Sequence, residues 1–113
     1  MAPSQEDIAP EEVARMHEAG EIELVDVREP YEHEAGHVAA ARHIEFARLS
    51  GEAGSIDRER PVVFYCRSGG RSAVATQAFR ASGYDARNMT GGLLAWAEKG
   101  LPLDPESGSV ADH

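Results

Sequence analysis

The sequence predicts a single α/β domain in which a central parallel sheet is flanked by helices on both faces. Short apolar runs rich in β-branched and aromatic residues alternate with segments whose apolar residues recur at helical spacing. A chain of 113 residues has the length of one domain, and strands that alternate with helices form parallel sheets covered on both sides. We expect the domain to span residues 5–104, followed by a polar, loose C-terminal tail at residues 105–113.

The first half of the chain carries strand and helix signals in alternation. Ile8 is expected in a short first strand. A helix is expected from Pro10 to Gly20, because proline suits the first helical position and glycine the position after the last. The elements expected next are a strand at 22–27, a helical turn from Pro30 to Gly36, a short strand at 41–44, a helical turn at 46–49 and a polar linker at 50–60.

The second half continues the same alternation. Residues 61–65, Pro-Val-Val-Phe-Tyr, predict a buried strand because they are uniformly apolar. A helix is expected at 71–82, a strand at 84–89 and a last helix at 90–100. Trp96 has helical spacing to other apolar residues of that last helix, which indicates a place in the core.

Composition excludes several classes of partner. The net charge of −9 argues against nucleic acid or an anionic membrane. Residues 1–7 lack the basic and apolar segments of a signal peptide, and no window approaches the ~20 apolar residues of a membrane span. One cysteine allows no internal disulfide, which suits a reducing compartment. We therefore expect a cytoplasmic protein.

The most informative stretch begins at that cysteine, Cys66, and continues as Arg67, Ser68, Gly69, Gly70, Arg71 and Ser72. It lies between a predicted strand and a predicted helix, which is where open α/β sheets bind ligands. The small residues allow successive backbone N–H groups to turn inward as an anion-binding nest, and the helix start adds further N–H groups.

Arg67 and Arg71 add positive charge beside the sulfur. All of these features favour a thiolate, which is the reactive form of cysteine. Cys66 is therefore predicted to be a nucleophile, and the alternative is an inert thiol in the core.

Four motifs occur in the order typical of one enzyme family. They are Leu24-Val-Asp26-Val-Arg28-Glu-Pro30, Gly36-His37-Val, Cys66-Arg-Ser-Gly-Gly-Arg71-Ser, and Gly91-Gly-x-x-x-Trp96 with a later Gly100-Leu-Pro102. Together they resemble a single-domain rhodanese, a sulfurtransferase, over about residues 5–104. The resemblance implies the rhodanese-like α/β fold and a persulfide on Cys66 as the covalent intermediate.

The resemblance also implies a reaction in two steps. Cys66 takes sulfur from thiosulfate or a similar donor, and cyanide or a low-molecular-weight thiol removes it. The loop from Arg67 to Ser72 would cradle the persulfide, and Arg67 and Arg71 would help to hold a donor anion. No cofactor or metal is implied, and a protein could replace the small-molecule donor or acceptor.

Three other functions compete with this enzyme. The first is a cysteine phosphatase or arsenate reductase, whose loop has five residues between the cysteine and the arginine and is wide enough for a tetrahedral phosphate. Cys66 and Arg71 have only four residues between them, which counts against this function. A sulfur carrier would share the persulfide and pass it to a protein. A binding module would keep the fold without turnover, and the presence of Cys66 and both arginines counts against it.

Asp26 and Arg28 are expected at the same edge of the sheet as Cys66, either tuning the site or forming a structural ion pair. Glu45 stands where the family usually has proline, and at the pocket rim it would disfavour an anionic donor. The acidic residues Glu29, Glu32 and Glu34 are most simply a solvated face.

His33 and His37 are four residues apart and could form half of a metal site on one helix. Gly36 interrupts that helix, and no third ligand is evident. His37 is therefore expected to be a hydrogen-bonded structural histidine.

Overall fold

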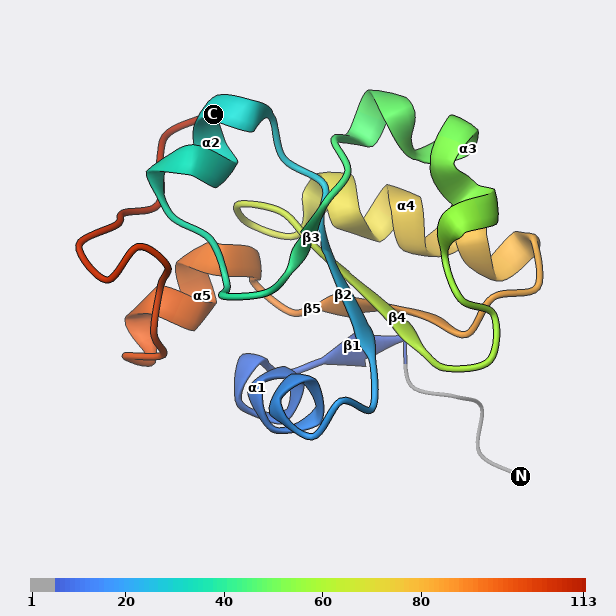
Figure 1. Ribbon diagram of the computed structural model, residues 1–113, viewed down its shortest axis with the longest axis horizontal. Helices are drawn as coiled ribbons and strands as arrows, with labels where there is room; N and C mark the ends of the chain where they lie inside the picture. The colour runs from blue at the N-terminus through green and yellow to red at the C-terminus, as the bar shows by residue number, and fades with distance from the viewer. Residues whose placement is uncertain (1–5) are drawn as a thin grey trace.

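Five parallel strands form the sheet at the centre of the computed structural model, which describes residues 6–113 (Figure 1). Their order across the sheet is β1-β5-β4-β2-β3. The strands are β1 (Asp7–Ile8), β2 (Glu23–Asp26), β3 (Arg42–His43), β4 (Val62–Tyr65) and β5 (Ala86–Met89). The predicted parallel sheet is confirmed. Residues 1–5, with the predicted domain start at residue 5 and most of the segment tested for a signal peptide, lie outside the described residues.

Four α-helices connect these strands, namely α1 (Pro10–Glu18), α2 (Pro30–Ala35), α3 (Leu49–Glu52) and α4 (Gly70–Ala81), and α5 (Gly92–Glu98) follows β5. Two 3₁₀ turns, η1 (Phe46–Arg48) and η2 (Ala53–Ser55), flank α3. The linker predicted at 50–60 is therefore partly wrong, since helical residues continue to Ser55. Leu49 and Ile56 are buried against the sheet, and this tertiary packing overrides the polar local sequence. No helix in residues 6–113 has the length and apolar character needed to cross a bilayer.

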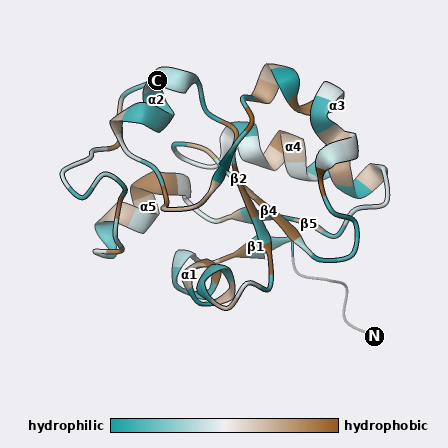
Figure 2. Ribbon diagram, in the orientation of Figure 1, coloured by the Kyte–Doolittle hydropathy of each residue, from teal (hydrophilic) through white to brown (hydrophobic). Residues whose placement is uncertain are grey.

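The core lies on both faces of the sheet, and β4 separates its two halves. All four residues of β4 are buried. Val62 and Phe64 pack with Phe79 of α4, while Val63 and Tyr65 belong to the cluster on the opposite face. The second cluster also contains Val13 of α1 and Leu93 and Trp96 of α5. Figure 2 shows the apolar character concentrated in the strands. Burying each large apolar side chain contributes about 1.5–3 kcal/mol.

Several chain segments meet at the carboxyl ends of the parallel strands. Because β2 and β4 are adjacent and parallel, Asp26 pairs with Tyr65 at their carboxyl ends, and Cys66 follows directly. Figure 1 places α2 and the C-terminus near these carboxyl ends. Residues 105–113, expected to be loose, instead contact α2, for example through the Ser109 N–H, which donates to the Ala35 carbonyl at 2.8 Å.

Candidate active site

Cys66 begins the loop between β4 and α4, and its side chain is almost fully enclosed, with 1% of the residue exposed. The Gly69 N–H points back at the sulfur and donates a hydrogen bond to Sγ at 3.1 Å. Gly69 has φ of 110°, a conformation that side chains disfavour. Glycine at this position thus lets the loop fold around the sulfur atom, as a backbone anion nest requires.

Ser72, in the first turn of α4, completes the surroundings of the sulfur. Its hydroxyl lies 3.4 Å from Cys66 Sγ and 2.6 Å from Asn88 Oδ1. Burial opposes the thiolate, but hydrogen bonds from the Ser72 hydroxyl and the backbone N–H groups of Ser72, Gly69 and Ser68 outweigh it, so the pKa of Cys66 is lowered. A hydroxyl has one hydrogen, so Ser72 must divide it between the sulfur and Asn88.

The amino end of α5 holds the start of the loop in place. Leu93 N–H donates to the Cys66 carbonyl at 2.8 Å, and Leu94 N–H donates to the Arg67 carbonyl at 3.0 Å. A Cβ on Gly92 would lie 2.5 Å from the Cys66 carbonyl oxygen, so only glycine permits this approach. The double glycine in the sequence therefore supports the reactive loop from a different helix.

Arg71 is bound by a carboxylate that the sequence interpretation assigned to a solvated face. Glu32 of α2 is fully buried, and its two oxygens accept hydrogen bonds from Arg71 Nη1 at 2.8 Å and Nη2 at 3.0 Å. Glu32 also accepts the Glu29 N–H at 3.0 Å as part of a capping box. Burial disfavours the Glu32 carboxylate, but hydrogen bonds from Arg71 and from the Glu29 N–H, together with nearby positive charge, outweigh this and lower its pKa. For Glu32, the prediction of a solvated position is wrong; Glu29 and Glu34 are exposed.

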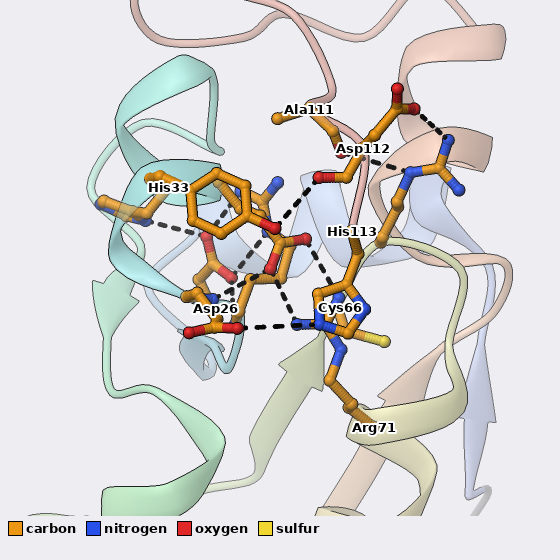
Figure 3. Close-up of polar contacts among 12 residues, drawn as sticks. Asp26, His33, Cys66, Arg71, Ala111, Asp112 and His113 are labelled. Carbon is orange, nitrogen blue, oxygen red and sulfur yellow. Dashed lines mark hydrogen bonds and ion pairs between the residues drawn. The ribbon is translucent and has the colours of Figure 1, made fainter.

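Arg67, the other loop arginine, turns toward residues 105–113. Its Nε donates to the Ala111 carbonyl at 3.2 Å, and its Nη2 lies 3.3 Å from Asp112 Oδ1 (Figure 3). Both loop arginines are therefore held by carboxylates. The lowered pKa of Cys66 has its main favourable causes in Ser72 and the loop N–H groups rather than in free arginine charges.

Asp26 and Arg28 lie together behind this layer, and both are fully buried. Arg28 donates from Nε and Nη2 to the two Asp26 oxygens at 2.9 and 2.7 Å, and Nη2 also donates to the Gly36 carbonyl at 2.8 Å. Burial disfavours the Asp26 carboxylate, but hydrogen bonds and charge from Arg28, with a further hydrogen bond from His33, outweigh it and lower the pKa of Asp26. The geometry matches the structural ion pair among the two roles predicted, since it links the end of β2 to the end of α2.

Three histidines form a stack beside Asp26. The rings of His33 and His37 are 3.8 Å apart, and those of His33 and His43 are 4.4 Å apart, nearly parallel in both cases. His33 Nδ1 lies 2.8 Å from Asp26 Oδ2, and His37 Nδ1 lies 2.7 Å from the His33 carbonyl. These hydrogen bonds engage Nδ1 of both rings, and within residues 6–113 no group of three or more His, Cys, Asp or Glu side chains is placed to hold a metal ion.

A cavity of about 300 Å³ lies beside the loop that begins at Cys66. Its walls are formed by Cys66, Arg67, Ser68, Gly70, Arg71 and His113. A neighbouring cavity of about 240 Å³ is lined by Glu45, Arg71 and His113 among others. Glu45 therefore lies near the rim, and its effect on an anionic donor stays a prediction. A larger hollow of about 640 Å³, lined by residues such as Ile56, Phe79 and Tyr84, contains no loop residue.

The predicted loop is thus assembled as one site, while four contributing residues escaped the sequence interpretation. The sequence did indicate that Asn88 makes a hydrogen bond, because a polar residue inside a buried strand needs a partner. Glu32 carried a weaker signal, as the third residue of a helix that begins at proline. Asp112 and His113 carried none. Chemically, the hydrogen-bond donors around Cys66 can stabilise its thiolate, or a negatively charged group bonded to its sulfur. No separate base is then needed to deprotonate the thiol.

Comparison with known proteins identifies the family and supports the fold. A family model described as a rhodanese-like domain matches residues 9–99. The HTH-type transcriptional regulator Rv0324 of Mycobacterium tuberculosis is 38% identical over 96 residues, which are 82% of this chain and 42% of the regulator. The thiosulfate sulfurtransferase GlpE of Pseudomonas aeruginosa is 31% identical over 111 residues, 97% of this chain and 99% of that protein.

Among solved structures, a rhodanese-related protein of Thermoplasma volcanium superposes with a TM-score of 0.80. It is 26% identical, and the match covers 86% of this chain and 95% of that one. The chain spans about half the length of the first curated relatives it matches, between 42% and 62%.

Proposed function

The chain belongs to the family of rhodanese-like domains, and from that premise we propose that it transfers sulfane sulfur through a persulfide on Cys66. The sulfur passes from thiosulfate or a similar small donor to cyanide or a thiol. The observation that carries the proposal is the cradle of the sulfur atom, in which Gly69 N–H and the Ser72 hydroxyl face Sγ beside an open cavity. The named activity of GlpE, which aligns over nearly the whole chain, supports the same chemistry.

In the first step the Cys66 thiolate attacks the outer sulfur of thiosulfate. A new S–S bond forms, the original S–S bond breaks, and sulfite leaves with its electron pair. The product is a persulfide anion on Cys66. The loop N–H groups that stabilise the thiolate serve the negative outer sulfur as well, since they are already turned inward.

In the second step the acceptor attacks the outer sulfur of the persulfide. The S–S bond to Cys66 breaks and the outer sulfur passes to the acceptor, so that cyanide becomes thiocyanate and a thiolate becomes a persulfide. The Cys66 thiolate is regenerated. Because Cys66 is the only cysteine, no second thiol of the chain can resolve the intermediate. The cycle is a double displacement, with the first product released before the acceptor reacts. We place it in the cytoplasm, where a catalytic thiol stays reduced.

A thiocyanate assay with thiosulfate and cyanide tests the proposal, with intact mass recorded after donor alone. The wild type should turn over and gain one sulfur atom, and Cys66→Ser should do neither. Ser68→Ala is the matched loop control, because it removes a hydroxyl and keeps the backbone N–H.

The same measurements separate the alternatives. Sulfur loading without turnover would indicate a carrier that awaits a protein acceptor. No loading from several sulfane donors would contradict both sulfur-transfer functions and leave a binding module.

A further inference from the structure

Residues 105–113 run back beside α2 (Figure 1), and their last residue, His113, lines the Cys66 cavity. Figure 3 shows Asp112 and His113 close to Cys66 and Arg71. The backbone of residues 105–113 is anchored on α2 and on the loop that follows it. Ser109 N–H donates to the Ala35 carbonyl at 2.8 Å, and the Tyr31 hydroxyl donates to the Asp112 carbonyl at 3.2 Å. The segment is therefore a docked part of the domain and not a solvated end.

The docking depends on a close backbone approach. A Cβ on Gly108 would lie 2.8 Å from the carbonyl oxygens of Ala35 and Pro105. Both contacts are with backbone atoms, which cannot rotate away as a side chain can. A single methyl group at Gly108 must therefore shift this segment.

The docked segment contributes two side chains to the site. His113 lines the cavity of Cys66, and its Nε2 lies 3.8 Å from Glu29 Oε2 across the rim. Asp112 places a carboxylate 3.3 Å from Arg67 Nη2. The other loop arginine is already held by Glu32, so Arg67 is the guanidinium available to an incoming anion, and Asp112 occupies it.

The ion pair between Arg67 and Asp112 is weak enough for an incoming anion to replace the Asp112 carboxylate. The Asp112 side chain is 98% exposed, and exposed ion pairs of this kind are weak because water competes for both groups. An anionic ligand that enters the cavity can displace this carboxylate without leaving a buried charge unpaired. Arg67 would keep the Ala111 carbonyl as a partner.

We propose that residues 105–113 form a selectivity segment, in which Asp112 competes with anionic sulfur donors for Arg67 at the mouth of the Cys66 cavity. The segment disfavours anionic reagents relative to neutral ones of the same size. This inference rests on the proposed function for its biological meaning, but its physical content concerns access to the Cys66 thiolate alone.

Alkylation of Cys66 in the full chain tests the proposal without requiring sulfur transfer. Iodoacetate is anionic and iodoacetamide is neutral, and both react with the same thiolate. In Asp112→Asn the ratio of the iodoacetate rate to the iodoacetamide rate should rise about two- to five-fold, the range expected for loss of an exposed ion-pair competitor. Gly108→Ala should raise the same ratio by shifting the whole segment.

Asp85→Asn is the matched control. Asp85 also accepts hydrogen bonds from an arginine, Arg87. It precedes β5 and so lies at the amino ends of the strands, whereas Cys66 follows the carboxyl end of β4. The ratio in Asp85→Asn should equal that of the wild type. A wild-type ratio in Asp112→Asn, or an equal rise in Asp85→Asn, would overturn the proposal. A raised ratio together with no thiocyanate formation would refute the proposed function alone.

Discussion

Removing the Ser72 hydroxyl should raise the pKa of Cys66. The hydroxyl lies 3.4 Å from the sulfur, and it is the leading favourable cause of the lowered pKa once the opposing effect of burial is taken into account. In Ser72→Ala the backbone N–H groups of the loop remain. The sulfur therefore keeps its hydrogen bonds from these N–H groups, and the change in pKa measures the contribution of the Ser72 hydroxyl alone.

The size of the shift follows from the geometry. A hydrogen bond to a charged group contributes about 1.5–3 kcal/mol, and one pKa unit corresponds to about 1.4 kcal/mol. The contact is long, and the single hydrogen of Ser72 is shared with Asn88, so the lower end applies. We expect the pKa of Cys66 to rise by about one unit, which means roughly tenfold less thiolate at a pH well below both pKa values.

The assay is the rate of iodoacetamide alkylation as a function of pH, whose inflection reports the thiolate directly. Ser68→Ala serves as the control, because no hydrogen bond of the Ser68 hydroxyl is found in the described part of the chain. Its inflection should match the wild type. An unchanged inflection in Ser72→Ala would refute the argument and assign the lowered pKa to the backbone alone.

Two further predictions concern the buried carboxylates. Glu32→Gln leaves Arg71 without its buried ionic partner and should destabilise the protein by about 3 kcal/mol, the lower end for broken buried pairs because Arg71 reaches solvent. Thermal unfolding should show a fall on the order of 10 °C, whereas exposed Glu34→Gln on the same helix should show almost none. Because the pKa values of Asp26 and Glu32 are lowered in the folded state, their contribution is full above their ordinary values near ~4 and is lost as the pH falls through the lower folded values. Urea unfolding between pH 7 and pH 3 should therefore show stability decreasing below about pH 4, with a smaller decrease in Glu32→Gln; equal stability at pH 6 and pH 3 would contradict this.

The sequence by itself determined the fold class and the reactive loop of this protein. The buried strand Val62–Tyr65 and the small residues after Cys66 are local features, so their consequences can be read without knowing the rest of the chain. Helix starts at Pro10 and Pro30 were predicted correctly for the same reason, because proline constrains its own backbone. The helical residues through Ser55 were missed, since they are stabilised by burial of Leu49 and Ile56 and not by local propensity.

Only the tertiary structure decided how the charges of the site are used. Whether an arginine beside Cys66 is free or paired depends on which carboxylate reaches it, and both partners come from distant parts of the chain: Glu32 for Arg71 and Asp112 for Arg67. Such pairing has no local signature, because an acidic residue looks the same in sequence on a solvated face and in a buried ion pair. The docking of residues 105–113 is decided in the same way, by a backbone approach that a polar composition cannot reveal.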